Sequence, residues 1–189
     1  MFLADTTGRH AVVEPGCDLG VSKLPVGTVT LVLADVEAST RLRETQPDEM
    51  TAAVARLNRT LSDVIAAHHG VQPVEQGEGN SFVVAFARAS QAAACAWELQ
   101  RIPLAPIRLQ IGLHTGETQP GDQGNYIGLT IERTARVRDL AHGGQTLLSG
   151  TTGALVVDRL PPDAWLVDLG TYPLGGATRL EREIGRAHV

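Results

Sequence analysis

Positive charge and aromatic rings are both scarce in this chain of 189 residues. The 16 lysines and arginines are outnumbered by 21 aspartates and glutamates, so the formal net charge is -5. Proteins that follow a nucleic-acid backbone carry basic surfaces, and those that stack on bases need exposed rings, yet aromatic residues make up only 4% of the chain. The composition therefore argues against a nucleic-acid partner.

Cysteines and long apolar runs are missing as well. Cys17 and Cys95 are too few for a disulfide framework, and Cys95 lies in the alanine-rich run AAACAW, which is typical of a small buried side chain. No segment approaches the ~18–20 consecutive apolar residues that cross a bilayer, and the N-terminus has no basic stretch followed by an apolar one. These absences predict a cytoplasmic protein that does not bind membranes.

The residues that are present suit one globular domain with a sizeable core, because 43% of the chain is hydrophobic and 20% is charged. Residues 1–25 carry no sustained period and are interrupted by glycine and proline, which predicts a partly ordered N-terminal leader. The main domain is expected over 26–180, followed by a C-terminal tail over 181–189.

The spacing of apolar residues predicts an α+β fold. A continuously apolar run from Val29 to Leu33 predicts a strand buried on both faces, whereas strict alternation over 107–114 predicts a half-buried strand. The order up to residue 114 is strand, helix, strand, strand, helix, strand, the ferredoxin-like βαββαβ arrangement. The expected strands of this core are 27–35, 71–76, 81–87 and 107–114, and the expected helices are 39–44, a second one closed by Gly70, and 90–100.

A C-terminal α/β extension follows the core. Its expected elements are a helix over 128–141, a short strand over 146–149, a helix near 151–157 and a last strand around 165–169.

Several segments resemble class III nucleotidyl cyclases, in the order in which that family carries them. They are VTLVLADVEASTRLRE, GEGNSFVVAF, IGLHTGE, NYIGLTIERTARV with AHGGQTLLS, and LVDLGTYPL. The resemblance covers about residues 27–175 and rests on the ordered set rather than on any single piece. It implies the class III cyclase fold.

The resemblance also implies a mechanism. In that family the domain works as a dimer with active sites in the groove between chains. Two aspartates of one chain hold two ions, Mg²⁺ or Mn²⁺, while an asparagine and an arginine of the other chain stabilise the transition state. The 3'-hydroxyl of a nucleoside triphosphate such as ATP attacks the α-phosphate and releases pyrophosphate, with cationic groups aimed at the developing charge.

The resemblance implies that this chain keeps only part of the family's set of metal ligands. Asp35 falls on the first metal aspartate of the family. In the hairpin, an alignment anchored on Phe86 puts Asn80 on the second metal aspartate and Gln76 on the lysine that selects the base. An alignment anchored on the Gly-acid pair would instead make Glu78 the second ligand, but it misplaces the apolar run by two residues.

Nucleotide-binding and catalytic positions are also substituted. Arg136 falls on the transition-state arginine, and Glu132, four residues earlier, takes the place of the transition-state asparagine. Asn125 lies at the second base-selecting position, and Gln110 at a strand position that is often a phosphate-binding arginine. Gly175 lies near a position where a lysine is common.

These substitutions predict that cyclic nucleotide synthesis is weak or lost. An asparagine brings no charge to offset a divalent ion, so the resemblance implies weak metal binding and one ion only. Glu132 replaces a donor by a carboxylate that faces a polyphosphate of like charge. The implied partner is a second copy in a homodimer, or another cyclase domain in a heterodimer that completes the site.

Other interpretations of the same residues stay open. The domain could be a fully active adenylate cyclase that uses Glu78 or Glu132 unconventionally, or a non-enzymatic ferredoxin-like interaction module. Asp35 could cap the following helix, and Arg136 could form an ordinary i,i+4 ion pair with Glu132. His114 is expected to have a structural hydrogen-bonding role rather than to act as a base.

Overall fold

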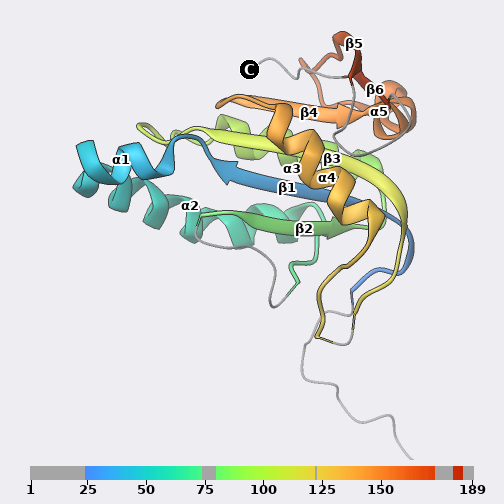
Figure 1. Ribbon diagram of the computed structural model, residues 1–189, viewed down its shortest axis with the longest axis horizontal. Coiled ribbons are helices and arrows are strands. Elements are labelled where there is room, and N and C mark those ends of the chain that lie inside the picture. Colours follow the sequence, from blue (N-terminus) through green and yellow to red (C-terminus); the bar gives the residue numbers. More distant parts are fainter. Residues whose placement is uncertain (1–23, 74–79, 122, 173–180, 185–189) are drawn as a thin grey trace, which may run out of the picture.

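The computed structural model describes residues 24–73, 80–121, 123–172 and 181–184 (Figure 1). The strands are β1 (Gly27–Val36), β2 (Phe82–Phe86), β3 (Leu109–Thr118), β4 (Gln145–Ser149), β5 (Asp168–Tyr172) and β6 (Glu181–Ile184). The helices are α1 (Ser39–Thr45), α2 (Pro47–Ala67), α3 (Ala89–Arg101), α4 (Leu129–Leu140) and α5 (Gly150–Val156), and a 3₁₀ turn covers Val157–Arg159.

The strands of the described residues join one sheet of six, in the order β2-β1-β3-β4-β6-β5. The pairs are antiparallel except for β3 and β4, which run parallel. Val71 forms a single antiparallel bridge with Ala85 on the outer side of β2, where the ferredoxin-like arrangement places its remaining strand. The predicted α+β fold, a ferredoxin-like core with a C-terminal α/β extension, is confirmed.

The sheet has two different faces, and Figure 1 shows α4 crossing one of them while α2 and α3 cover the other. Val32, Ala34 and Val36 of β1 pack into the large cluster formed with α2, α3 and α5. The alternate β1 residues Val29, Leu31 and Leu33 pack into a smaller cluster near α4. Both faces of β1 are therefore buried, as the run from Val29 to Leu33 predicts.

Helix α2 begins at Pro47, with its apolar stripe turned to the core. Its last residue is Ala67, and His69 adopts a left-handed conformation with φ of 57°. The sequence predicts that Gly70 closes the helix, but the reversal lies at His69. Gly70 is needed for a different reason, because a Cβ there would lie 2.7 Å from the ring of Phe86.

Strand β3 is not half-buried, which corrects the prediction from its alternation. Gly112 and His114, on the face expected to be exposed, are both buried. Helix α4 packs directly on β3 there, and a Cβ on Gly112 would lie 2.6 Å from the Cα of Arg138. Alternation reveals which face is apolar, but it does not reveal that a helix can cover small and polar residues on the other face.

Three further expectations meet a different outcome. Of the strand expected over 71–76, the described part forms only the Val71 bridge, and residues 74–79 lie outside the described residues. The last strand lies at Asp168–Tyr172 rather than around 165–169. Strand β6, at Glu181–Ile184, lies in the segment expected to be a tail and pairs with both β4 and β5.

Cys95 is a free, fully buried residue of α3, as its alanine-rich surroundings predict. Burial, with a smaller contribution from the charge of Glu98, raises the pKa of its thiol from 9.0 to about 12. None of the helices in the described ranges has the length and apolarity that a bilayer crossing requires.

Candidate active site

Asp35 lies near the end of β1, directly opposite Gln110 of β3. Its carboxylate oxygen Oδ1 accepts a hydrogen bond of 2.8 Å from the backbone N–H of Val36. Alternation along β1 puts Asp35 on the same face as Leu33, the face that α4 covers. The first predicted metal ligand is half-buried at the C-terminal end of the interior strand β1, close to the end of α4.

Gln110 is used to hold that helix end. Its Nε2 donates a hydrogen bond of 3.0 Å to the backbone carbonyl of Ala141, just after α4. One of the last carbonyls of α4, which lack partners within the helix, is satisfied in this way. The side chain at the phosphate-binding position thus has a structural partner within the chain.

Glu37 is a residue of this region whose importance sequence reasoning missed. Its backbone N–H donates to the carbonyl of Arg108 at 2.9 Å, and its Oε1 accepts from the backbone N–H of Gly143, also at 2.9 Å. A side chain on Gly143 would collide with the Glu37 carboxylate. Glu37 therefore ties the end of β1 to the turn between α4 and β4. The signal in the sequence that could have drawn attention to Glu37 is its position two residues after Asp35.

The two predicted catalytic residues lie one turn apart on α4. Arg136 Nη2 and Glu132 Oε2 are 3.9 Å apart, and the two side chains are 34% and 54% exposed. This is the ordinary i,i+4 ion pair that the spacing allows. Within one chain, the guanidinium at the transition-state position therefore has a carboxylate of the same helix as its partner.

Asn125 lies at the other end of the sheet. The loop that contains it follows Thr118, which is paired with Gly27, whereas Asp35 is paired with Gln110. The ladder between these two pairs is about 27 Å long at ~3.4 Å per residue. The backbone carbonyl of Asn125 accepts a hydrogen bond of 2.7 Å from the N–H of Gly121. The structure therefore does not bring Asn125 together with Asp35.

Asn80 lies just before β2 and is half-buried. Its Nδ2 atom is buried and has no hydrogen-bond partner. Asn80 lines a cavity of about 410 Å³ together with residues of α1 and α2, and Asp35 does not line this cavity. Gln76, Glu78 and Gly175, the other positions considered from the sequence, lie outside the described residues.

His114 is held in a buried polar cluster. Its Nδ1 lies 2.7 Å from Oγ of Ser149, and that hydroxyl lies 3.2 Å from Oγ1 of Thr152. Thr152 in turn lies 3.0 Å from Thr115, whose hydroxyl lies 2.9 Å from that of Thr30. The predicted structural role of His114 is confirmed by these contacts.

No family model matches the chain. An uncharacterized protein of Mycobacterium tuberculosis is 60% identical over 174 residues, covering 92% of this chain and 61% of the relative. A second uncharacterized protein of the same species is 51% identical over 149 residues, covering 79% of this chain and 58% of the relative. The chain thus spans about three fifths of the length of these relatives. A receptor-type adenylate cyclase of Trypanosoma brucei brucei is 28% identical over 179 residues, covering 67% of this chain and 14% of that protein.

Solved structures decide the fold. An adenylate cyclase from Trypanosoma brucei, in its monomeric state, superposes with a TM-score of 0.72 at 24% identity, covering 88% of this chain and 92% of that one. The guanylate cyclase domain of RhGC from Catenaria anguillulae, in complex with GTP, gives 0.71 at 15% identity and covers 86% and 98% of the two chains. This chain has the class III nucleotidyl cyclase fold.

The cyclase fold is present, but the described residues do not fit a two-metal centre. Asp35 and the cavity lined by Asn80 belong to different faces of the sheet, and Asn80 offers a neutral amide. Within the described ranges, no group of three or more histidine, cysteine, aspartate or glutamate side chains could hold a metal ion. Of the two metal ligands predicted from the sequence, only Asp35 carries a carboxylate.

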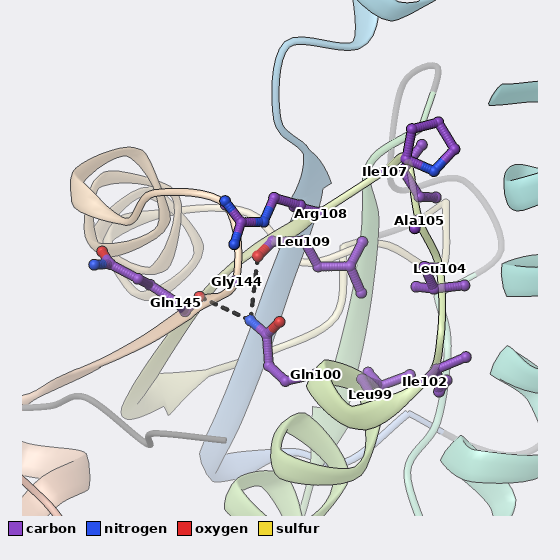
Figure 2. A pocket seen from close by; sticks show the side chains of 12 residues that line it. Leu99, Gln100, Ile102, Leu104, Ala105, Ile107, Arg108, Leu109, Gly144 and Gln145 are labelled. Atoms are coloured by element: carbon purple, nitrogen blue, oxygen red, sulfur yellow. Dashed lines mark hydrogen bonds between the residues drawn. The ribbon is translucent and has the colours of Figure 1, made fainter. Parts of the chain in front are cut away.

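A cavity of about 560 Å³ in this cyclase-fold domain is lined by neighbours of the candidate site, among them Gln145, which is paired with Gln110, and Gly143, which donates a hydrogen bond to Glu37. Figure 2 shows it between the end of α3, the segment 102–108 and the turn before β4. The side chain of Gln100 donates hydrogen bonds to the carbonyls of Leu109 at 3.2 Å and Gln145 at 2.9 Å. None of the predicted site residues that the structure describes lines this cavity. Size alone does not locate the candidate active site.

Proposed function

We propose that this chain is a class III nucleotidyl cyclase-like signalling domain whose synthesis of a cyclic nucleotide from ATP is weak or lost. The observation that supports it best is the pairing of Arg136 with Glu132 on α4. A carboxylate takes the place of a donor and also offsets the charge of the neighbouring guanidinium.

Physical chemistry gives this pairing its weight. The charge on the transferring phosphoryl group is stabilised by donors fixed toward it before the reaction. Losing one such donor costs about 100- to 1000-fold in rate. Glu132 removes the donor and adds repulsion toward a triphosphate, so the reduction is expected at or beyond the upper end of that range. Mg²⁺ or Mn²⁺ is expected to bind weakly, as one ion at Asp35.

A partner chain is part of the proposal. Asp35 and Asn125 are at opposite ends of the β1–β3 ladder, so one chain alone cannot present both to one nucleotide. A homodimer, or a heterodimer with another cyclase domain, would bring such residues together across a groove. A neighbouring structure, the guanylyl cyclase domain of the RhoGC fusion protein from Blastocladiella emersonii, is described as a non-canonical dimer; its TM-score is 0.68 at 16% identity, covering 85% of this chain and 97% of that one.

The direct test is restoration of the substituted positions. We expect the purified protein to make little or no cyclic AMP from ATP with Mn²⁺ or Mg²⁺. The triple variant Gln76→Lys, Asn80→Asp, Glu132→Asn should raise the rate at least 100-fold, because it returns a transition-state donor at position 132. Chromatography measures the cyclic AMP that is formed, and sedimentation shows whether the protein is dimeric.

Matched variants keep the result interpretable. Adding Asp35→Ala to the triple variant should abolish the gain, whereas Arg133→Ala, an exchange on α4 outside the predicted site, should leave it in place. Robust turnover by the unmodified protein, lost in Asp35→Ala, would show a fully active enzyme. A folded, dimeric triple variant with no gain would contradict the assignment of the site.

A further inference from the structure

The cavity at the end of α3 is a second candidate binding site. Its volume of about 560 Å³ is within the ~300–1,000 Å³ typical of small-molecule pockets. Part of its wall is the turn before β4, where the backbone N–H of Gly143 donates to the carboxylate of Glu37. The cavity is therefore next to the candidate active site without containing its predicted residues.

The cavity contains an amide oxygen that is fixed in place and open to a ligand. Nε2 of Gln100 donates to the carbonyls of Leu109 and Gln145 and lies 3.2 Å from Oγ1 of Thr146. Because carbonyls only accept, these contacts fix which end of the amide is the nitrogen. Oε1 has no partner among the described residues and is not one of their shielded polar atoms, so a molecule in the cavity can reach it. Figure 2 shows this oxygen on the side of the amide that faces Leu104 rather than Gln145.

A cation lies in the opposite part of the cavity wall. Arg108 lines the cavity, and Figure 2 shows its guanidinium beside Gly144. This exposed side chain forms no ion pair or hydrogen bond with any described residue. Glu37, which contacts the same turn, accepts a hydrogen bond from Gly143 instead. Among the described residues that line the cavity, Arg108 alone is charged.

These groups restrict the chemistry of a ligand. A guanidinium pairs with oxyanions, and one cation balances the single charge of a carboxylate better than the charge of almost two on a phosphate monoester. The oxygen of Gln100 needs a donor. The described lining has no carboxylate to balance an ammonium group, so a neutral hydroxyl suits this oxygen better. Ile102 and Leu104 supply apolar surface in the same wall.

We propose that this cavity binds a small hydroxy acid with an aliphatic chain. The carboxylate of the ligand pairs with Arg108, its hydroxyl donates to Oε1 of Gln100, and its chain packs on Ile102 and Leu104. Arg108 and Gln100 together select the ligand, because each recognises a different group of it. The site does not depend on cyclase activity, so its test is independent of the restoration experiment.

Three probes separate the parts of this proposal. 3-Hydroxyhexanoate carries the charge, the hydroxyl and the chain, whereas hexanoate lacks the hydroxyl and pentan-2-ol lacks the carboxylate. At about five times its Kd, 3-hydroxyhexanoate should raise the Tm of the full chain by roughly 2–4 °C, and the other two should give smaller shifts at the same concentration. An equal shift with hexanoate would overturn the role of Gln100, and an equal shift with pentan-2-ol would overturn that of Arg108.

Variants and a resonance of the wild type identify the binding residues. Arg108→Gln should weaken 3-hydroxyhexanoate binding at least fivefold, while Arg101→Gln, an exchange of an exposed residue of α3 outside the cavity, should not. Equal affinities of the wild type and both variants would overturn the proposal. The side-chain amide resonance of Gln100 in ¹⁵N-labelled wild type should move with 3-hydroxyhexanoate and less with hexanoate. An unmoved resonance would also overturn the proposal, and this readout needs no variant to fold.

Discussion

The two faces of the central sheet are stabilised in different ways. On the α2 and α3 side, a single large cluster of aliphatic and aromatic side chains fills the space between helices and strands. On the α4 side, the helix lies close to the strands over glycines, and the chain just after its C-terminal end is held by the hydrogen bonds of Gln110 and Glu37. The first face fixes the fold, and the second carries Asp35, Glu132 and Arg136. Functional residues on the second face can therefore be substituted while the packing of the first face keeps the domain folded.

The largest effect is expected from emptying the apolar face. Phe86 is fully buried, and its ring packs against the backbone of Gly70. Phe86→Ala should lower the free energy of unfolding by about 3–5 kcal/mol, because the transfer energy is lost and a cavity remains. Phe86→Leu should cost much less, because more of the volume is kept. Urea unfolding measures both; equal losses for the two variants would show that packing volume on this face is not what matters.

A smaller but more local effect is expected beneath α4. Gly112→Ala adds a Cβ that would lie 2.6 Å from the Cα of Arg138, so the helix backbone must move away from β3. Such overpacking costs about 1–3 kcal/mol. In an NMR spectrum, amide shifts should concentrate in α4 and leave α2 unchanged.

Gly116→Ala is the matched control for this comparison. A Cβ there meets the side chain of Thr130 at 2.8 Å rather than a helix backbone. Thr130 can rotate away by giving up the hydrogen bond of its hydroxyl to the carbonyl of Glu117, so the loss should be smaller than at Gly112, where a helix backbone must move. If both variants are equally tolerated, α4 is not held by close backbone contact, and the contrast between the two faces fails.

The sequence predicts the apolar face better than the α4 face, for a physical reason. Apolar periodicity records burial, so the strand around Leu31 and the stripe of α2 that contains Leu57 could be found. Contacts of Gly112 and the hydrogen bond from Gly143 to Glu37 join residues far apart in the chain and leave no period. Strand β6 was missed likewise, because a four-residue strand is defined by its neighbours β4 and β5.

The candidate site likewise has features that the sequence could predict and features that it could not. Motif order predicts Asp35 and Arg136 as site residues, and spacing could anticipate the ion pair of Arg136 with Glu132. The cavity beside Asn80 could not be anticipated, because it is formed by α1 and α2 and not by the motif itself. The structural use of Gln110 also needed the position of the α4 end.

Titration of Cys95 and Tyr126 also compares the two faces. Near neutral pH its expected effect on stability is the smallest of those predicted. Burial is the main cause that raises the pKa of Cys95 from 9.0 to about 12 on the α3 side. Burial also raises the pKa of Tyr126 from 10.0 to about 12 on the α4 side, where its hydroxyl donates to the carbonyl of Pro25 at 2.8 Å. Below pH 9 both groups are neutral in the folded and unfolded chain, and stability is unaffected by either.

Above pH 9 the unfolded chain loses the Cys95 proton while the folded chain keeps it. Stability should then fall by about 1.4 kcal/mol per pH unit until the folded thiol ionises near pH 12, and Tyr126 should add a second decline that begins near pH 10. Cys95→Ala should remove the decline between pH 9 and 10, and Tyr126→Phe should reduce only the later one. Urea unfolding midpoints measured at pH 8, 9, 10 and 11 distinguish the two declines in stability. Coincident profiles for wild type and Cys95→Ala would mean that the apolar face admits the thiolate, and is therefore less tightly closed than its packing indicates.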